Sequence, residues 1–153
     1  MKTSPLSINL WFNGNAEEAV AFYTSIFSDA STGRITRAGD KIIAIGFQLN
    51  GQSFVALNGG PQYSFSEAIS FIINGETQAE IDYYWEKLSE DADPNAQQCG
   101  WLKDKFGISW QIVPSQLGEM LGSSDPQQSQ RVLNALMSMK KLDIAQLEAA
   151  ANV

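Results

Sequence analysis

Two stretches of the chain repeat one pattern of hydrophobic and polar positions. Residues 12–23 (FNGNAEEAVAFY) and residues 73–85 (INGETQAEIDYYW) both pass from an apolar run through Asn-Gly to a polar residue that can cap a helix. In both, a Glu follows the predicted cap residue, Asn15 or Thr77, by three positions, and two aromatic residues follow by seven and eight. This spacing predicts a duplicated strand-turn-helix unit, although such turns and caps are also common at unrelated junctions.

Further elements follow from the spacing of the apolar residues. Helical spacing after Asn15 predicts a first helix with one apolar face, and Ile81, Tyr84, Trp85 and Leu88 predict a second helix with a complete core face. Asn-Gly at 50–51 predicts a hairpin. The expected strands are residues 7–12, 34–38, 42–49 and 53–57 in the first half and 68–73, 99–103 and 109–114 in the second, with loops at 28–33 and 91–98 and a turn at 104–107.

The last part of the chain is predicted to be helical. A short turn is expected at residues 116–121, and Asp125-Pro126 is typical of a helix start, with that helix ending at Lys140-Lys141. Asp143 is expected to cap a final helix that runs to Ala151. These helices have apolar residues on one side, so they must pack on the body of the protein or on a partner subunit.

Strands mixed with helices in this order predict an α+β fold. We expect residues 1–153 to form a single domain, with module one at about 5–64, module two at about 65–114 and a helical extension at 115–153.

Composition narrows the classes of partner and compartment. The chain has 153 residues, 10 basic against 17 acidic, and a net charge of −7, which disfavours nucleic acid and anionic membrane as partners. Its first residues, MKTSPLSINLW, have no apolar stretch of signal-peptide or membrane length, and a single Cys cannot form an internal disulfide. The expected compartment is the cytoplasm.

Histidine is absent from the sequence. This excludes Ser-His-Asp and Cys-His catalysis and histidine-based metal sites. Acid-base chemistry would therefore depend on carboxylates, Tyr, Lys or Cys99, and without a basic cluster beside it Cys99 is interpreted as a structural or incidental thiol.

Three segments carry a resemblance to a known family. The segments FNGNAEEAVAFYTSIF, FVALNGGP and QCGWLKDKFGISWQIVP resemble the PhnB-like branch of the vicinal oxygen chelate superfamily, over residues 5 to about 145. That superfamily includes glyoxalase I, bleomycin-resistance proteins and extradiol dioxygenases. The resemblance implies two βαβββ modules that form a U-shaped mixed sheet around a small-molecule cavity, in a homodimer.

The resemblance also allows tests of cofactor chemistry. PhnB-like members often carry the label 3-demethylubiquinone 3-methyltransferase, but Asn13-Gly14-Asn15 lacks the glycine spacing of a nucleotide-cofactor site, so we do not predict methyl transfer. The family's metal-ligand positions fall on Ile8 and Gln111, and near Asn58 and Glu67. With at most one carboxylate among them, no metal site and no cofactor are predicted.

The residues predicted to bind a ligand are Trp11, Asn58, Glu67, Trp101, Phe106 and Gln111. Each has a plainer interpretation: core packing for the aromatic residues, a turn for Asn58, and solvation for Gln111. Glu67 is a weak candidate for a general base if burial raises its pKa, and otherwise a surface carboxylate in a loop.

Three functions from different classes remain open. The preferred hypothesis is a metal-free protein that binds a small, partly apolar molecule. The alternatives are an enzyme on a small organic substrate, of the lyase, isomerase or transferase type, and a non-catalytic dimeric interaction protein.

Overall fold

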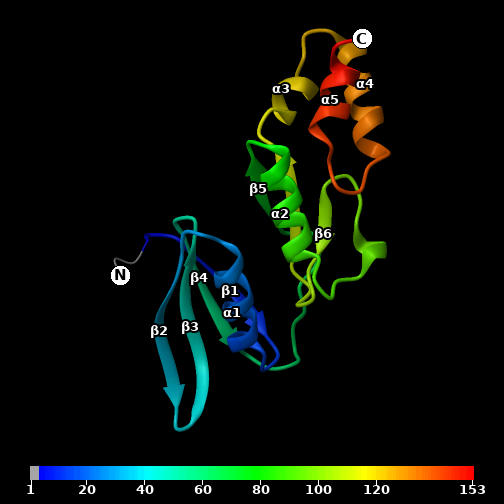
Figure 1. Ribbon diagram of the computed structural model, residues 1–153. Coiled ribbons are helices and arrows are strands. Elements are labelled where there is room, and N and C mark those ends of the chain that lie inside the picture. Colours follow the sequence, from blue (N-terminus) through cyan, green and yellow to red (C-terminus); the bar gives the residue numbers. More distant parts are fainter. Residues whose placement is uncertain (1–3) are drawn as a thin grey trace. The chain divides into compact units, whose positions relative to one another are not determined.

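The computed structural model describes residues 4–153, which divide into two compact units. Unit 1 ends at Phe65, and unit 2 runs from Ser66 to Val153. Unit 1 contains a four-stranded sheet with one helix, and unit 2 contains a three-stranded sheet with several helices (Figure 1). The predicted α+β class with C-terminal helices is confirmed.

Unit 1 is a mixed sheet with one helix. Its strand order is β1-β4-β3-β2, in which β1 pairs with β4 in parallel and the other pairs are antiparallel. The elements are β1 (Ser7–Phe12), α1 (Ala16–Ile26), β2 (Ala30–Ala38), β3 (Lys41–Leu49) and β4 (Gln52–Asn58). The loop predicted at 28–33 is wrong, because β2 already starts at Ala30, which pairs with Leu49. A register shift follows in β2 and interrupts the alternation of side chains.

The core of unit 1 lies between α1 and the sheet. Ala19, Val20 and Tyr23 are buried on one face of α1, as predicted, and the Tyr23 ring is stacked with that of Phe47, with the ring centroids 6.4 Å apart. The predicted hairpin is also confirmed. Asn50 and Gly51 have φ values of 47° and 83°, the left-handed pair that a tight hairpin turn needs.

Unit 2 begins with a second strand-helix segment. Its strand order is β5-β7-β6, with β5 parallel and β6 antiparallel to β7. The elements are β5 (Ser70–Gly75), α2 (Gln78–Leu88), the short 3-10 helix η1 (Pro94–Ala96), β6 (Trp101–Lys103) and β7 (Ser109–Pro114). This is one strand fewer than a βαβββ module has.

The segment before β6 does not extend as predicted. The strand expected from Cys99 starts at Trp101, because Cys99 and Gly100 have φ values of 55° and 86° and a strand cannot continue through this conformation. The strand predicted at 109–114 is confirmed.

Helix α2 packs closely on its sheet, but over a narrower face than predicted. Ile81 and Leu88 are fully buried, whereas Tyr84 and Trp85 are only half-buried. A Cβ on Gly75 would lie 2.8 Å from Ile81 Cγ1, so strand and helix approach one another where only glycine fits. The turn predicted at the second Asn-Gly is wrong, because Gly75 still belongs to β5.

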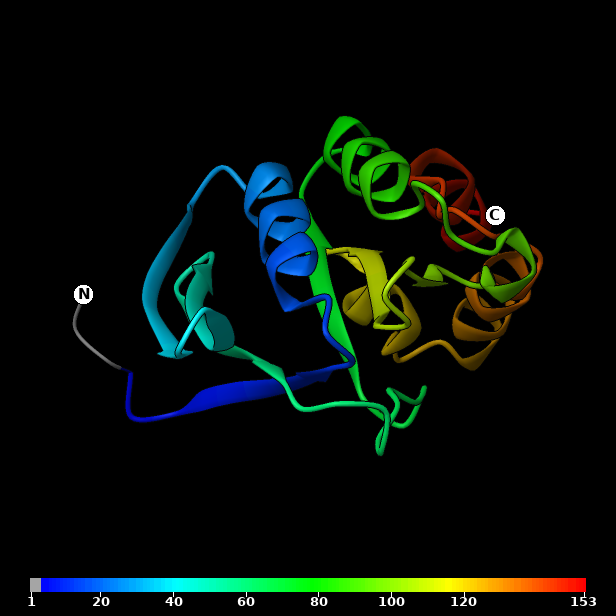
Figure 2. The ribbon, with the colours of Figure 1, turned by 90° about the horizontal axis from the view of Figure 1, so that it is seen from below.

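Three helices follow the sheet of unit 2 and lie beyond one end of it in Figure 1, and Figure 2 shows the orange and red ones, α4 and α5, next to each other. They are α3 (Leu117–Leu121), α4 (Pro126–Met137) and α5 (Ile144–Ala151). The predicted caps are confirmed: Asp125 Oδ1 accepts from Gln127 N and Asp143 Oδ1 from Gln146 N, both at 3.0 Å. Helix α4 ends at Met137, before the predicted Lys140-Lys141.

The C-terminal extension is part of unit 2. Val132, Met139, Leu142 and Leu147 form its buried cluster. Gln78, on the first turn of α2, donates to Leu142 O and accepts from Ile144 N, at 3.0 and 2.8 Å. The apolar side of the extension therefore packs on the body of its own chain. No helix within residues 4–153 is long and apolar enough to span a membrane.

Candidate functional site

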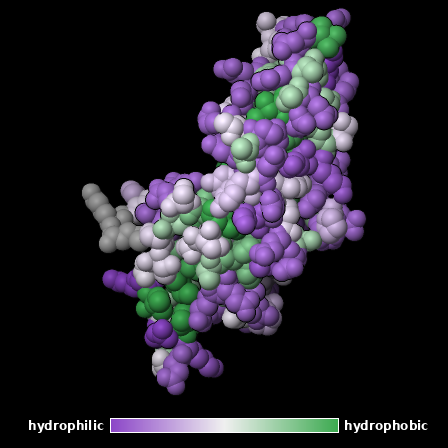
Figure 3. Space-filling model, viewed as in Figure 1, coloured by the Kyte–Doolittle hydropathy of each residue, from purple (hydrophilic) through white to green (hydrophobic). Residues whose placement is uncertain are grey.

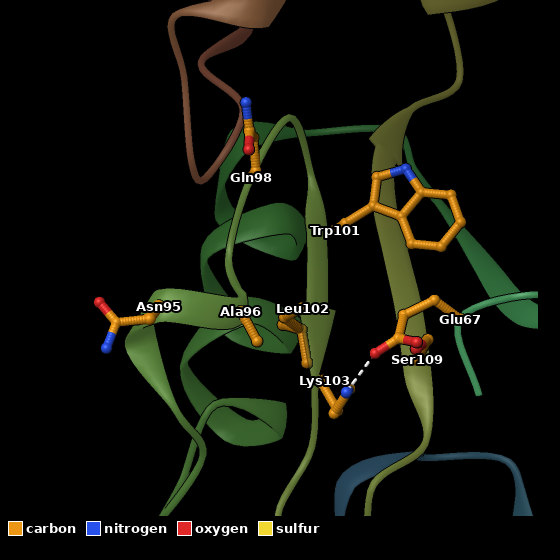
Figure 4. Close-up of a pocket in the computed structure, with 8 residues that line it drawn as sticks. All are labelled: Glu67, Asn95, Ala96, Gln98, Trp101, Leu102, Lys103 and Ser109. Atoms are coloured by element: carbon orange, nitrogen blue, oxygen red, sulfur yellow. Dashed lines mark ion pairs between the residues drawn. The ribbon is translucent and has the colours of Figure 1, made fainter. Parts of the chain in front are cut away.

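A cavity of about 190 Å³ opens in unit 2 beside β6 (Figure 4). Its lining comes from the segment before β5, from the η1 region, and from β6 and the start of β7. The lining residues are Glu67, Asn95, Ala96, Gln98, Trp101, Leu102, Lys103 and Ser109. Two of the residues predicted from the sequence, Glu67 and Trp101, are among them.

Strand register sets which side chains meet on the cavity side of the sheet. Trp101 lies opposite Gln111 and Lys103 lies opposite Ser109, so these four side chains share one face. The side chain of Leu102 lies on the alternate, core face and is buried, although Leu102 is also among the residues that line the cavity. Gln111 is half-buried and donates from Nε2 to Ser70 Oγ at 2.9 Å. It lies next to the cavity lining and is not part of it.

An ion pair joins Glu67 and Lys103 across the cavity. The side chain of Glu67 is 62 % exposed. The hydrogen bond from Lys103 lowers the pKa of Glu67 below its ordinary value, with smaller contributions from a backbone hydrogen bond and the lysine's charge. Glu67 is therefore a surface carboxylate in a loop, the plainer of the two interpretations, and the burial that would have raised its pKa is not present.

Ser109 is the buried polar group of the site. The residue is only 2 % exposed, and its hydroxyl has no hydrogen-bond partner within residues 4–153. Buried hydroxyls are normally hydrogen-bonded, so this one is able to bind a polar group that enters the cavity. Sequence reasoning missed Ser109, although alternation along the strand predicted at residues 109–114 puts it on the same face as Gln111 and was a signal that could have found it.

The far wall of the cavity, which is the wall that carries Asn95 and Gln98, is joined to the C-terminal extension by hydrogen bonds. Lys140 Nζ donates to Pro94 O at 3.3 Å, and the backbone N–H groups of Cys99 and Gly100 donate to the carbonyls of Met139 and Lys140, each at 2.8 Å. The segment that carries Asn95 and Gln98 is thus fastened to the loop between α4 and α5.

The turn between β6 and β7 is organised by a buried carboxylate. Asp104 Oδ1 accepts from the backbone N–H groups of Phe106 and Ile108, at 2.9 and 3.0 Å, and Oδ2 accepts from Trp110 Nε1 at 2.8 Å. The sequence predicted the turn but not this role of Asp104. Phe106 is half-buried in the turn, with Lys105 Nζ 5.9 Å from its ring centroid, and is not among the residues that line the cavity.

Trp11 and Asn58 lie in unit 1. The Trp11 ring fills the space where a Cβ on Gly59 would lie, and its Nε1 donates to Gly60 O at 2.9 Å. It also makes an edge contact with the ring of Tyr63, with centroids 4.9 Å apart.

Asn58 is engaged in the fold of unit 1. Its Oδ1 accepts from Ala16 N, at the start of α1, and its Nδ2 donates to Ile42 O, both at 3.0 Å. A ligand-binding role for Trp11 and Asn58 stays a prediction.

The positions that the resemblance assigned to metal ligands do not form a suitable donor set. Ile8 has no donor atom, and it pairs with Phe54, whose ring stacks on Phe47 at 5.1 Å on the α1 side of the sheet. It therefore lies on the opposite face of β1 from Trp11, because successive side chains of a strand alternate between the two faces. Gln111 offers only an amide. Among residues 4–153, no three His, Cys, Asp or Glu side chains form a group that could hold a metal ion.

Comparison with known proteins assigns the chain to a family. The family described as 3-demethylubiquinone-9 3-methyltransferase matches residues 4–113. The chain belongs to this family. The predicted resemblance to the PhnB-like branch of the vicinal oxygen chelate superfamily is thereby confirmed.

Solved structures agree with the family. The PhnB protein of Bacillus cereus is 33 % identical, with a TM-score of 0.63, and the match covers 72 % of this chain and 99 % of that one. Protein PA1353 of Pseudomonas aeruginosa is 19 % identical, with a TM-score of 0.59 and coverage of 73 % and 98 %. A possible glyoxalase of Bacillus cereus is 13 % identical, with a TM-score of 0.50 and coverage of 72 % and 98 %. The last two show the fold alone. No curated protein was found to match.

The family match ends well before the chain does. The resemblance expected to reach about residue 145 stops at residue 113, so α3, α4 and α5 lie outside the match. The loop that holds the far wall of the cavity belongs to this added segment.

Proposed function

We propose that this member of the family binds a small, partly apolar organic molecule in the cavity beside β6, without a tightly bound transition metal. The observation that carries the proposal is the combination of a buried, unpartnered Ser109 hydroxyl with the Trp101 indole in one cavity. Ligand sites are commonly apolar concave surfaces with a few polar groups that orient the ligand.

The size of the cavity limits the ligand. At about 190 Å³, it is smaller than the roughly 300–1,000 Å³ typical of sites for drug-sized molecules. It suits a single-ring compound, or one end of a longer ligand.

Binding is better supported than catalysis by the groups at the site. A general base works best when its pKa is near the working pH, whereas the pKa of Glu67 is lowered by Lys103. This carboxylate is a weak base, and the sequence has no histidine to replace it. No observation favours the enzymatic alternative over the binding function.

A thermal-shift screen tests the proposal. A ligand present at about 100 times its Kd stabilises the native state by roughly 2.7 kcal/mol, so binders in a diverse library of small molecules should raise Tm. Binders should lose their effect on Ser109→Val and Trp101→Ala and keep it on Leu133→Ala, a control on the exposed side of α4. A library without any stabilising compound contradicts the proposal and favours a protein interaction module.

Elemental analysis tests the absence of metal. Ile8 and Gln111 leave too few anionic or imidazole donors for tight binding, so protein purified without chelator and dialysed should hold well below one equivalent of any transition metal. A stoichiometric metal would refute the metal-free proposal and move the enzymatic alternative ahead.

We further infer a homodimer. Ile69 and Ile72 are 72 % and 56 % exposed, and Ile72 shares the sheet face of Trp101 and Gln111, away from α2. Apolar side chains so exposed are typical of surfaces that another chain covers. Sedimentation at micromolar concentration should show a species of twice 16.8 kDa, and a species at the monomer mass alone would exclude the dimer.

A further inference from the structure

The Glu67–Lys103 ion pair joins two exposed side chains. Glu67 is 62 % exposed and Lys103 38 %. Exposed ion pairs contribute little to stability because water and salt compete with them. An anion from solution can therefore replace Glu67 without unfolding the site.

Lys103 and Ser109 are placed to share one anion. They lie directly opposite one another on neighbouring strands, so their side chains rise from the same face of the sheet. The ammonium group of Lys103 has three donors, and one of its interactions is the pair with Glu67 Oε1. The Ser109 hydroxyl lacks a hydrogen-bond partner within the described chain. A carboxylate has two oxygens, one for each of these groups.

Trp101 supplies an apolar surface at a suitable spacing. It lies two residues before Lys103 on the same face of β6, about 7 Å along the strand. In Figure 4 the indole is on the same side of β6 as Glu67 and Ser109, and a dashed line joins the carboxylate of Glu67 to Lys103. A carboxylate held by Lys103 would therefore place an attached ring beside the indole, where aromatic rings pack favourably.

We propose that Lys103, Ser109 and Trp101 form a site for a single-ring aromatic carboxylate, and that Glu67 is an internal competitor which occupies Lys103 until such a ligand displaces it. The proposal rests on the binding function above and names its ligand class. Glu67 is then not a catalytic residue: its side chain lowers the affinity of the site for the carboxylate ligand.

The test is titration with benzoate, followed by NMR through the Trp101 indole N–H and the backbone amide of Ser109. Glu67→Gln should bind benzoate about two- to fivefold tighter than the unmodified protein, because the change removes the carboxylate that competes for Lys103. The gain is small because an exposed ion pair is weak. Lys103→Met should bind it about tenfold more weakly or worse, since a charge-assisted contact is lost. Benzamide, which is neutral, should show little difference between the unmodified protein and Glu67→Gln.

Glu90→Gln is the matched control. Glu90 is 63 % exposed and pairs with Lys105 at 3.6 Å, so this change removes the same charge from a similar pair away from the cavity. It should leave benzoate affinity unchanged. An equal gain in Glu90→Gln would show a general charge effect and overturn the proposal, as would weaker binding by Glu67→Gln, which would make Glu67 a positioning residue.

The remaining outcomes separate this proposal from the function on which it rests. If benzoate binds no variant while neutral compounds from the screen bind at Ser109 and Trp101, the anion site is refuted and the binding function stands. If neither benzoate nor any compound of the screen binds, both are refuted.

Discussion

The two strand-helix segments, β1–α1 and β5–α2, carry one sequence pattern but cap their helices differently. In α2, Thr77 Oγ1 accepts from Glu80 N at 3.2 Å, and Glu80 Oε2 accepts from Glu76 N at 2.8 Å. In α1, the cap residue Asn15 makes no side-chain cap bond, and Asn58 from β4 bonds the first helical N–H instead. A capping pattern in the sequence therefore does not show whether the capping hydrogen bond comes from a neighbouring residue or from one distant in the chain.

The two units also complete their cores differently. In unit 1, the hairpin of β2 and β3 widens the sheet, and α1 packs against it. In unit 2, the sheet has three strands, and Leu142 of the extension packs against Gly100, where a Cβ would lie 3.0 Å from Leu142 Cδ1. The surface of the extension mixes hydrophilic and hydrophobic residues (Figure 3). We conclude that unit 2 depends on a segment outside the family match.

The largest expected effect is from Leu142→Ala. Leu142 is fully buried in the cluster of the extension, and truncating a buried Leu costs about 2–5 kcal/mol. Hydrogen exchange should show faster opening in unit 2 and little change in unit 1. Leu133→Ala, at a residue 40 % exposed, is the control. An equal loss of protection in both units would refute the idea that the extension serves unit 2.

A smaller effect is expected from Asn58→Ala. The change removes the cap of α1 and the hydrogen bond to Ile42 O, so the free energy of unfolding should fall by about 1–3 kcal/mol. Urea denaturation measures the loss. Asn15→Ala, which removes no cap bond, should cost clearly less. If Asn15→Ala proves the more damaging change, α1 is capped locally after all and the contrast between the helices disappears.

In α2 the corresponding change is Thr77→Ala. Loss of one N-cap side chain costs about 1 kcal/mol, and urea denaturation should report a loss of this size. Thr77→Ser retains the hydroxyl and should stay near the unmodified protein. A Thr77→Ala protein of unchanged stability would show that the cap is redundant.

The smallest effect concerns pH and the link between α2 and the extension. Lys141, 2.9 Å from Asp82, lowers the pKa of Asp82 below its ordinary value of 3.8, and Gln78 adds to this. A carboxyl whose folded-state pKa is lowered stabilises the protein above its unfolded-state pKa, and this contribution disappears as pH falls through the folded-state value.

Asp82→Asn should therefore be slightly less stable than the unmodified protein at pH 7, with a difference in Tm that shrinks as pH falls below about 4. Lys141→Met should behave in the same way. A difference that persists unchanged in acid would mean that the ion pair does not contribute.

Much of the secondary structure was predictable because its signals are local. The hairpin at Asn50-Gly51, the caps at Asp125 and Asp143, and the strand at residues 109–114 each depend on backbone preferences within a few residues, and each is confirmed. The strand boundaries at Ala30 and Trp101 were missed, because they depend on the pairing partner of one strand and on left-handed residues before the other.

The site was predictable only in part. Glu67 and Trp101 were named from the sequence, but Lys103, Ser109 and Gln98 were not, because the sequence does not show which faces of its strands and loops meet at the cavity. The direction of the pKa shift of Glu67 could not be predicted from the sequence, because it depends on a lysine on β6 that no local pattern connects to it.

The sequence by itself determined the fold class, the family and the lack of histidine chemistry, since these depend on composition, periodicity and motifs along the chain. The tertiary structure decided which asparagine caps α1, which face Ile8 occupies, and which carboxylate pairs with Lys103. Each of these is a contact between residues distant in the chain, and its energy depends on strand register and burial, which a linear pattern does not contain.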